Sequence, residues 1–240
     1  MTGDRSTAED ATRSASGDDR LAQQLRGFGP IGIIAMLLIL LAGNLTAGNM
    51  VVFPAGAFLA LLWAWRSRTP WQAIGYVRPT SWVLTISGGV AFGVALKFAM
   101  KAVVMPLFGA NPINVTYHFL AGNRAMLPAA AWAMLVAGFG EETVFRGYLF
   151  ERGAKLFGRG HAAKVLIIVA TAAVFGLAHY ADQGLPGAEQ GAVVGLVFGT
   201  IFAATGHIFW LMFAHSAFDL TALALIYWDL ESRVAHFIFK

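Results

Sequence analysis

The sequence predicts an all-α protein, a polytopic bundle of about seven transmembrane helices. Hydrophobic residues make up 58% of the chain, charged residues make up 12%, and the mean hydropathy is +0.64. Several long apolar runs are nearly free of charge, and a run of about 20 apolar residues can cross a membrane as a helix. The modest net charge of +4 makes nucleic acid an improbable partner, and the lipid bilayer is the expected one. Because the chain has no cysteine, disulfides, thiolate metal sites and thiol nucleophiles are excluded.

Four segments follow one another along the chain. Residues 1–26 mix basic and acidic side chains with Ser, Thr, Gly and Ala, a composition typical of a disordered polar tail. Because this segment lacks the layout of a cleavable signal peptide, we expect it to stay attached. Transmembrane helices are predicted over residues 27–108, a second helix bundle over 125–227, and a C-terminal tail over 228–240.

The predicted spans are separated by polar or glycine-rich connections. They cover residues 28–42, 50–65, 82–108, 125–157, 162–180, 191–205 and 207–227. The first two spans are short and form a hairpin through a turn at residues 43–49. The stretch 71–76 is aromatic and flanked by arginines, which is the composition of a membrane-interface anchor.

The distribution of Lys and Arg predicts the orientation of the bundle. The connections at residues 66–78 and 152–164 are the richest in positive charge, so both are expected in the cytoplasm. The connection at 181–190 carries two acids and no Lys or Arg, which agrees with the opposite side. The N-terminus would then be cytoplasmic and the C-terminus outside. The tail composition favours a bacterial inner membrane.

Three charged residues interrupt the fourth predicted span: Glu141, Glu142 and Arg146. Each ionised group near a bilayer centre costs about 2.5 to 3.5 kcal/mol, so such residues need a partner or a function. On a helix Glu142 and Arg146 lie one turn apart and are expected to pair. Glu141 is left without a cation of its own and is a candidate general base. The other interpretation is that all three form a polar clamp between helices.

A second island, Phe175 to His179, lies on the fifth predicted span. Glu141 precedes the turn at 158–160 by about as many residues as His179 follows it, so two antiparallel helices would hold them at one depth. Phe175 is one helical turn before His179 and would wall the same face. A packed histidine that only makes a hydrogen bond is the alternative.

The last predicted span carries a third island, His215 and Asp219, again one turn apart. Such a pair can orient an imidazole, face a developing oxyanion or ligate a metal. Simple helix packing is the alternative. Lys97 and Lys101 on the third span also share a face, and they can snorkel, pair with a carboxylate or line a cavity.

Three motifs thus succeed one another on the late spans. They are Glu141-Glu142-x-x-x-Arg146, Phe175-x-x-x-His179 and His215-x-x-x-Asp219. In this order they resemble the signature of the CPBP family, the CAAX proteases and bacteriocin-processing enzymes also called the Abi family. The resemblance covers about residues 125–225.

The resemblance implies an intramembrane endopeptidase that acts on a membrane-anchored peptide or protein, typified by enzymes that trim prenylated CAAX proteins. It implies that Glu141 and His179 activate water and that His215 and Asp219 stabilise the oxyanion. Prenyl-protein enzymes of the family usually have Asn at the last position, and an ionised Asp219 cannot donate to an oxyanion, so Asp219 is expected to orient His215. Glu142 and Arg146 would support these groups from behind.

We favour a metal-free glutamate protease without a cofactor. The alternative is a metalloprotease with zinc held by Glu141, His179 and His215. Two non-enzymatic functions are also weighed. One is a transporter in which the buried charges relay protons or ions, and the other is an immunity or scaffold protein that binds a peptide in the same cavity.

Overall fold

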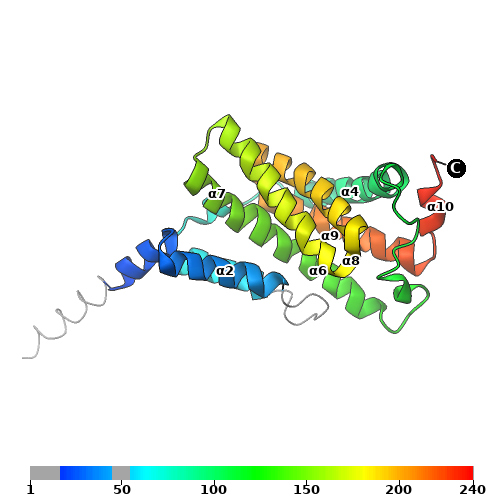
Figure 1. Cartoon of the computed structure of the whole chain (residues 1–240), viewed down its shortest axis with the longest axis horizontal. Coiled ribbons are helices and arrows are strands. Elements are labelled where there is room, and N and C mark those ends of the chain that lie inside the picture. The colour runs from blue at the N-terminus through cyan, green and yellow to red at the C-terminus, as the bar shows by residue number, and fades with distance from the viewer. Residues whose placement is uncertain (1–16, 45–54, 240) are drawn as a thin grey trace, which may run out of the picture.

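The computed structural model describes residues 17–44 and 55–239, and in these residues every regular element is helical. Figure 1 shows an elongated bundle with the N-terminal helices toward one end and the C-terminal helix α10 at the other. The all-helical prediction is confirmed.

The N-terminal part is a pair of short helices, α2 (Pro30–Asn44) and α3 (Ala55–Arg66), which pack against each other. The helices fall within the first two predicted spans, apart from the last two residues of α2 and Arg66. The predicted turn at 43–49 begins inside α2, and its residues 45–49 lie outside the described residues, as does the start of the second span.

Residues 17–26 were assigned to a disordered tail, but they form a helix. The apolar side chains Leu21, Ala22 and Leu25 explain the difference, because Ala22 is fully buried and the Trp63 indole Nε1 donates to the Leu25 carbonyl at 3.0 Å. The Arg152 guanidinium also donates to the Arg26 carbonyl at 2.9 Å. The rest of the predicted tail, residues 1–16, lies outside the described residues.

The third predicted span is one long helical stretch made of α4 (Trp82–Ala99), the π-helical segment η2 (Met100–Val104) and α5 (Met105–Leu107). Ser81 caps its start, since the Ser81 hydroxyl accepts a hydrogen bond from the Leu84 amide. A short 3₁₀ helix, η1 (Trp71–Ile74), connects it to α3 and occupies the predicted interface stretch.

The fourth predicted span is also continuous, but it changes helical type at its charged island. It consists of α6 (Leu127–Glu142), the π-helical segment η4 (Thr143–Tyr148) and α7 (Leu149–Phe157). The π segment begins directly after Glu142, and every residue in it is buried. Wide π turns inside α-helices occur frequently at functional sites.

Helix α8 (His161–Thr205) contains the fifth and sixth predicted spans, folded back on each other. The break is Gly184, whose φ of 62° and ψ of −158° are accessible almost only to glycine. A Cβ on Gly176 would lie 2.7 Å from the Ala188 carbonyl oxygen, and one on Gly195 would lie 2.8 Å from Ala172 Cα. The two limbs are therefore antiparallel and in backbone contact.

Helix α9 (Ile208–Tyr227) is held between α4 and α6 by glycines. A Cβ on Gly93 would come within 2.0 Å of the Ala214 carbonyl oxygen, and one on Gly138 within 2.6 Å of the Ser216 amide nitrogen. Small residues allow helices in membranes to approach this closely. The two contacts flank His215 in sequence and fix the depth and rotation of its side chain.

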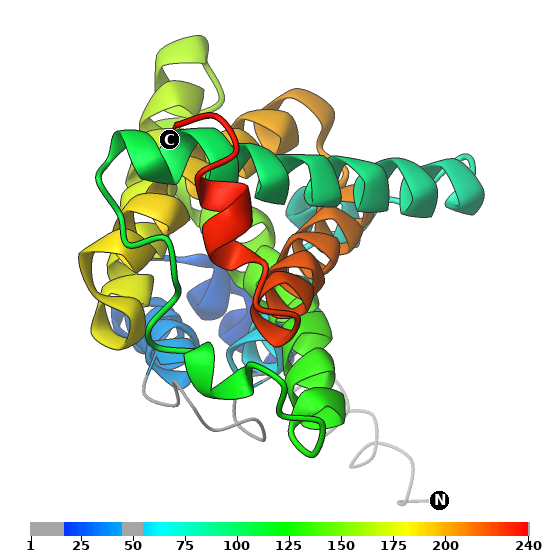
Figure 2. The same ribbon diagram turned by 90° about the vertical axis from the view of Figure 1, so that its right-hand side faces the viewer.

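The end of the bundle near α10 is closed by the connection between α5 and α6, which includes the 3₁₀ helix η3 (His118–Leu120). Figure 2 looks onto this end and shows the connection crossing it beside α8 and α10. Within the predicted C-terminal tail, residues Glu231–Ala235 form α10. The reason is a buried ion pair in which Lys101 Nζ lies 2.8 Å from Glu231 Oε1.

By length and composition, three helical stretches among the described residues can each cross a membrane: Trp82–Leu107, His161–Thr205 and Ile208–Tyr227. The bent pair Gly17–Arg26 and Pro30–Ala42 would make a fourth. This criterion does not give the seven predicted spans. Helix α3 is too short to be counted, the charges in the stretch from α6 to α7 lower its hydropathy, and the two limbs of α8 are counted as one span. The apolar helices fit a multi-pass membrane protein.

Candidate active site

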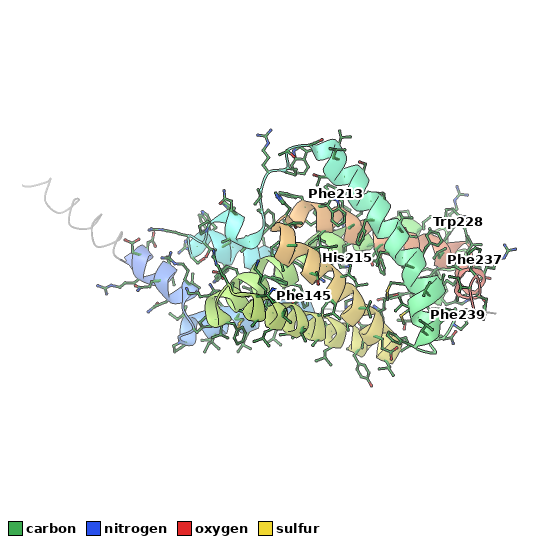
Figure 3. All side chains as sticks on the ribbon, turned by 90° about the horizontal axis from the view of Figure 1, so that it is seen from above. Phe145, Phe213, His215, Trp228, Phe237 and Phe239 are labelled. Carbon is green, nitrogen blue, oxygen red and sulfur yellow. The ribbon has the colours of Figure 1, made fainter. Side chains whose placement is uncertain are left out.

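A cavity of about 500 Å³ lies inside the bundle, between α4, α6, α8 and α9. Its wall contains the four side chains for which the sequence predicts catalytic roles: Glu141, His179, His215 and Asp219. They come from three helices and from positions up to 78 residues apart (219 − 141 = 78). The structure thus brings the three islands together at one cavity, and Figure 3 shows His215 and Phe145 inside the bundle.

Behind the cavity, the Glu142 carboxylate binds both the Arg146 guanidinium and the His215 ring. Its side chain is 0% exposed, and Oε1 lies 2.8 Å from Arg146 Nη1 and 2.7 Å from His215 Nδ1. The predicted pair of Glu142 with Arg146 is confirmed. Because an ionised carboxylate only accepts hydrogen bonds, Nδ1–H of His215 is the donor. Glu142 thereby fixes the ring and directs Nε2 into the cavity.

Arg146 is held by more than its carboxylate. The guanidinium lies 4.8 Å from the centre of the Phe175 ring and 5.4 Å from that of Phe198, and Nη2 donates to the Gly195 carbonyl at 3.5 Å. Cation–π contact on these rings stabilises a charge that has no access to water. The π segment η4 supplies Arg146 and buries it at this point.

The cavity side of His215 faces two carboxylates. Nε2 lies 3.6 Å from Glu141 Oε2 and 3.6 Å from Asp219 Oδ2. Asp219 was expected to orient His215, but Glu142 is the residue on Nδ1, and Asp219 lies on the side of Nε2. The hydrogen bond at Nδ1 is thus made by Glu142, a contact across 73 residues that local spacing does not reveal, and the orienting role of Asp219 stays a prediction.

Glu141 differs from its neighbour in placing an unpartnered oxygen in the wall of the cavity. Oε2 of Glu142 is also buried without a hydrogen-bond partner among the described residues, but Glu142 does not line the cavity. Oε2 of Glu141 is buried from bulk solvent and has no hydrogen-bond partner within the described part of the chain. Buried polar atoms are nearly always paired, so an exception in a cavity points to a water molecule or substrate group there. The geometry suits a carboxylate that accepts a proton from a water in the cavity.

His179 is oriented by the backbone of its own helix. Its Nδ1 lies 2.8 Å from the Phe175 carbonyl oxygen, and because a carbonyl only accepts, Nδ1 carries the proton. In the neutral ring Nε2 is then free to accept a hydrogen bond in the cavity. A Cβ on Gly191 would lie 3.2 Å from Nδ1, so the second limb of α8 packs directly on the ring.

The Phe175 ring contacts the side chains of both cavity histidines and of Arg146. It is 2% exposed, and its ring meets those of His179, His215 and Phe145 edge to face, with centroids 4.6, 5.9 and 4.8 Å away. The predicted wall residue does line the cavity. Its rigid ring separates His179 from the Arg146 charge and keeps both histidines in fixed orientations.

Residues 123–221 match the model of the type II CAAX prenyl endopeptidase Rce1-like family. The matched family is part of the CPBP family, in agreement with the resemblance of the three motifs. The matched segment contains all three motifs and ends two residues after Asp219 (221 − 219 = 2). Neither the curated proteins nor the solved structures contain a match to the chain.

The match suggests CAAX-type intramembrane protease activity, and a protease of the matched family would act on membrane-associated substrates. The matched segment supplies most of the cavity lining, from α6, η4, α8 and α9. The lining residues that precede the match lie on α2, α3, α4 and the connection between α5 and α6, and the one from α4 is Lys97. Of the alternatives left open for the two lysines, Lys97 lines the cavity, and Lys101 pairs with the carboxylate of Glu231.

The described residues contain no group of three or more His, Asp or Glu side chains placed to hold a metal ion. One nitrogen of each cavity histidine is already bonded within the protein, Nδ1 of His179 to the Phe175 carbonyl and Nδ1 of His215 to Glu142. The arrangement can perform acid–base chemistry on a water molecule through Glu141 and can supply a donor at His215 Nε2.

Proposed function

We propose that the chain is an intramembrane endopeptidase that hydrolyses a peptide bond in a membrane-anchored peptide or protein, including prenylated CAAX-type tails. The observation that carries the proposal is the unpartnered Glu141 Oε2, which lies in the cavity 3.6 Å from His215 Nε2. A free carboxylate oxygen beside a histidine is the arrangement needed to activate water next to a polarised carbonyl.

In the proposed reaction a water molecule binds between Glu141 and His179. Glu141 Oε2 takes one proton while the water oxygen attacks the carbonyl carbon, and His179 Nε2 accepts a hydrogen bond that orients the water. The C=O π electrons move to the oxygen and form a tetrahedral oxyanion. When this intermediate collapses, the C–N bond breaks and Glu141 returns its proton to the leaving amine, so the residue ends in its starting state.

His215 would stabilise the oxyanion. Since Nδ1–H is donated to Glu142, the ring can donate at Nε2 only as the imidazolium, which has a proton on both nitrogens. Three carboxylates surround the ring and supply the counter-charge: Glu141, Glu142 and Asp219. One donor of this kind contributes about 10²- to 10³-fold to the rate in other enzymes.

Asp219 and the pair of Glu142 and Arg146 would act through His215. Glu142 sets the orientation of the ring, and Arg146 neutralises Glu142 so that one net charge less is buried. Asp219 adds a negative charge near Nε2 without bonding to Nδ1. These are positioning roles, since none of the three is needed to touch the reacting atoms.

We further propose that the bundle has seven spans in a bacterial inner membrane, with the basic connections at 66–78 and 152–164 in the cytoplasm. The described helices offer one segment for each predicted span when the two limbs of α8 are counted separately and α6 to α7 is taken as one. The buried partners of Glu142 and Arg146 support the insertion of α6 to α7, because a paired charge costs less in a membrane.

The test is proteolysis of a panel of prenylated and unprenylated membrane-anchored peptides by the purified protein, beside Glu141→Ala, each with and without a chelator. We expect cleavage by wild type that resists the chelator and is lost in Glu141→Ala. Chelator sensitivity that zinc reverses would favour zinc held by Glu141, His179 and His215. No cleavage of any peptide would contradict the protease proposal and favour the transporter or the scaffold.

A further inference from the structure

One end of the cavity is bounded by a segment to which the mechanism above gives no task. This segment, residues 109–122, lies between α5 and α6, and we call it the strap. It begins and ends at glycines with positive φ, Gly109 at 71° and Gly122 at 63°. Figure 2 shows the strap crossing the end of the bundle beside α8 and α10. Five strap residues line the cavity: Asn114, Thr116, Tyr117, Phe119 and Leu120.

A buried carboxylate holds the strap to α10. Glu231 is 3% exposed, and the Asn114 amide donates to both of its oxygens, at 3.1 Å to Oε1 and 3.2 Å to Oε2. Oε1 also accepts from Lys101 Nζ at 2.8 Å, so α10, η2 and the strap meet at one group. Hydrogen bonds to an ionised carboxylate are stronger than those between neutral groups. Glu231 therefore fixes the position of the strap at Asn114.

On the opposite side the strap meets the break in α8 through neutral groups. The Thr116 hydroxyl donates to the Asp182 carbonyl at 3.2 Å, and the Tyr117 phenol hydrogen-bonds the Gln183 side chain. The last part of the strap rests on α9, where Leu120 is 4% exposed and packs in an apolar cluster. The middle of the strap is thus held between Glu231 and the α8 break.

The environment of Tyr117 shows that the strap faces the reacting groups. Burial raises the pKa of this phenol above its ordinary value, and the carboxylates of Asp182, Asp219 and Glu141 raise it further. The hydrogen bond with Gln183 lowers the pKa in part. The hydroxyl therefore stays protonated at neutral pH and can donate a hydrogen bond in the cavity. A peptide bound against Glu141 would contact the strap on its other side.

Stability alone does not require the ion pair that holds the strap. Exchanging a buried ion pair for well-packed apolar side chains is often neutral or stabilising, because burying two charges costs about as much as their attraction returns. An apolar pair in place of Lys101 and Glu231 would still pack α10 on η2. It would not accept a hydrogen bond from the Asn114 amide. The task that needs the carboxylate is therefore the placement of the strap.

We propose that Glu231 is a positioning residue of the active site, which holds the strap so that Asn114, Thr116 and Tyr117 form a wall on which the substrate peptide binds. The inference rests on the proposed protease function and deepens it. Both partners lie outside the family match, since the strap precedes residue 123 and α10 follows residue 221. Glu231 itself touches no reacting atom and acts through the Asn114 amide. Releasing the strap opens the cavity to water and weakens peptide binding while every reacting group stays in place.

The first experiment measures how accessible the cavity is, and it uses the absence of cysteine from the chain. Ala137→Cys places a single thiol in the cavity wall and is the cavity reporter. Ala64→Cys places one in the core outside the cavity and is the core reporter. The rate at which N-ethylmaleimide labels each thiol in detergent reports how often its surroundings open.

Each reporter is placed in four backgrounds. They are the otherwise wild-type chain, Glu231→Gln, which keeps one acceptor oxygen, the double variant Glu231→Leu with Lys101→Met, and Asp229→Asn. The double variant removes the carboxylate together with its buried cation, so no uncompensated charge is left between them. Asp229→Asn is the control, because it changes an exposed acid two residues before Glu231.

We expect the double variant to label the cavity reporter about 10- to 100-fold faster than the wild-type background, the factor set by one hydrogen bond to a charged group. Glu231→Gln should give a smaller increase and Asp229→Asn none, and the core reporter should react at one slow rate in all four. Equal acceleration of both reporters would assign the pair to global stability. An unchanged rate at the cavity reporter would show that the strap does not depend on Glu231. Either result overturns the inference.

Cleavage kinetics without reporters test the consequence for the substrate. On a prenylated peptide the double variant should raise KM by about tenfold or more and change kcat by less than about threefold, because Glu141, His179 and His215 lie on other helices. A fall in kcat at unchanged KM would place the effect in the reaction step and contradict a binding wall.

The labelling experiment needs no cleavage and therefore separates this inference from the protease proposal. If the cavity reporter responds as expected but no peptide is cleaved, the placement of the strap by Glu231 stands and the protease fails. If peptides are cleaved while both the labelling rate and KM ignore Glu231, the strap assignment fails and the protease stands.

Discussion

Two faces of one helical turn, at Glu141 and Glu142, carry the same side chain in opposite environments. On the rear face Glu142 is 0% exposed, and its Oε1 contacts both Arg146 and His215. On the cavity face Glu141 is 17% exposed, and its Oε2 has no hydrogen-bond partner among the described residues. Oε2 of Glu142 also has no hydrogen-bond partner in the described part of the chain, but Glu142 does not line the cavity. The two carboxylates therefore differ in where the unpartnered oxygen lies, in the cavity for Glu141 and inside the packed bundle for Glu142. The rear face supports the fold, and the cavity face is available for chemistry.

Glu141→Gln should have the largest effect on the cavity face. The amide keeps the volume of the side chain but cannot take a proton, so cleavage should fall by about 10³-fold or more, the combined size of acid–base and electrostatic contributions. Glu189→Gln is the matched control, because Glu189 does not line the cavity. Cleavage within tenfold of wild type in Glu141→Gln would remove Glu141 from the reaction.

Glu142→Ala should have the largest effect on the rear face. It leaves Arg146 as an uncompensated buried charge, and breaking such a pair lowers the free energy of unfolding by about 3 to 5 kcal/mol. Thermal unfolding in detergent micelles measures the change. The double variant Glu142→Leu with Arg146→Met removes both charges and should recover much of the lost stability. Equal instability of the single and double variants would show that the pair does not hold this face.

Gly93→Ala should disturb both faces through the backbone. An added Cβ would lie 2.0 Å from the Ala214 carbonyl oxygen, so α4 and α9 must separate next to His215. Overpacking of this kind costs about 1 to 3 kcal/mol, and the shift of His215 should lower cleavage by more than the loss of folded protein explains. Ser87→Ala, on the exposed side of α4, is the control. Wild-type stability in Gly93→Ala would mean that the helices do not touch there.

Asp219→Asn should have the smallest effect. Asp219 lies 3.6 Å from His215 Nε2 without occupying Nδ1, and Asn retains its size. We expect a change of less than about tenfold in kcat/KM, the range of a modest electrostatic contact. A loss comparable to that of Glu141→Gln would give Asp219 a direct part in the reaction and would revise the division between the two faces.

The features that the sequence predicts correctly are those set by neighbouring residues along the chain, such as helical spans and contacts within one helical turn. The long apolar runs gave spans at 82–108 and 207–227, and the helical stretches occupy 82–107 and 208–227. The spacing of Glu142 and Arg146 predicted their ion pair, because four residues make one helical turn. Five of the motif residues line the cavity, namely Glu141, Phe175, His179, His215 and Asp219, whereas Glu142 and Arg146 lie behind it.

The missed features depend on contacts between distant segments. The helix at 17–26 is stabilised by Trp63 and Arg152, and α10 by the pair of Glu231 with Lys101, 130 residues away. The bond between Glu142 and His215 and the π segment after Glu142 also form only when the helices pack. No spacing within one helix encodes such pairings.

The most direct measurement is the cleavage rate and the unfolding temperature of Glu141→Gln and Glu142→Gln, each taken on a single purified preparation beside wild type. The division of the two faces predicts that Glu141→Gln unfolds at the wild-type temperature and does not cleave. It predicts that Glu142→Gln unfolds at a lower temperature and retains measurable cleavage below its transition. The reverse pattern, an unstable Glu141→Gln and a stable but inactive Glu142→Gln, would contradict it.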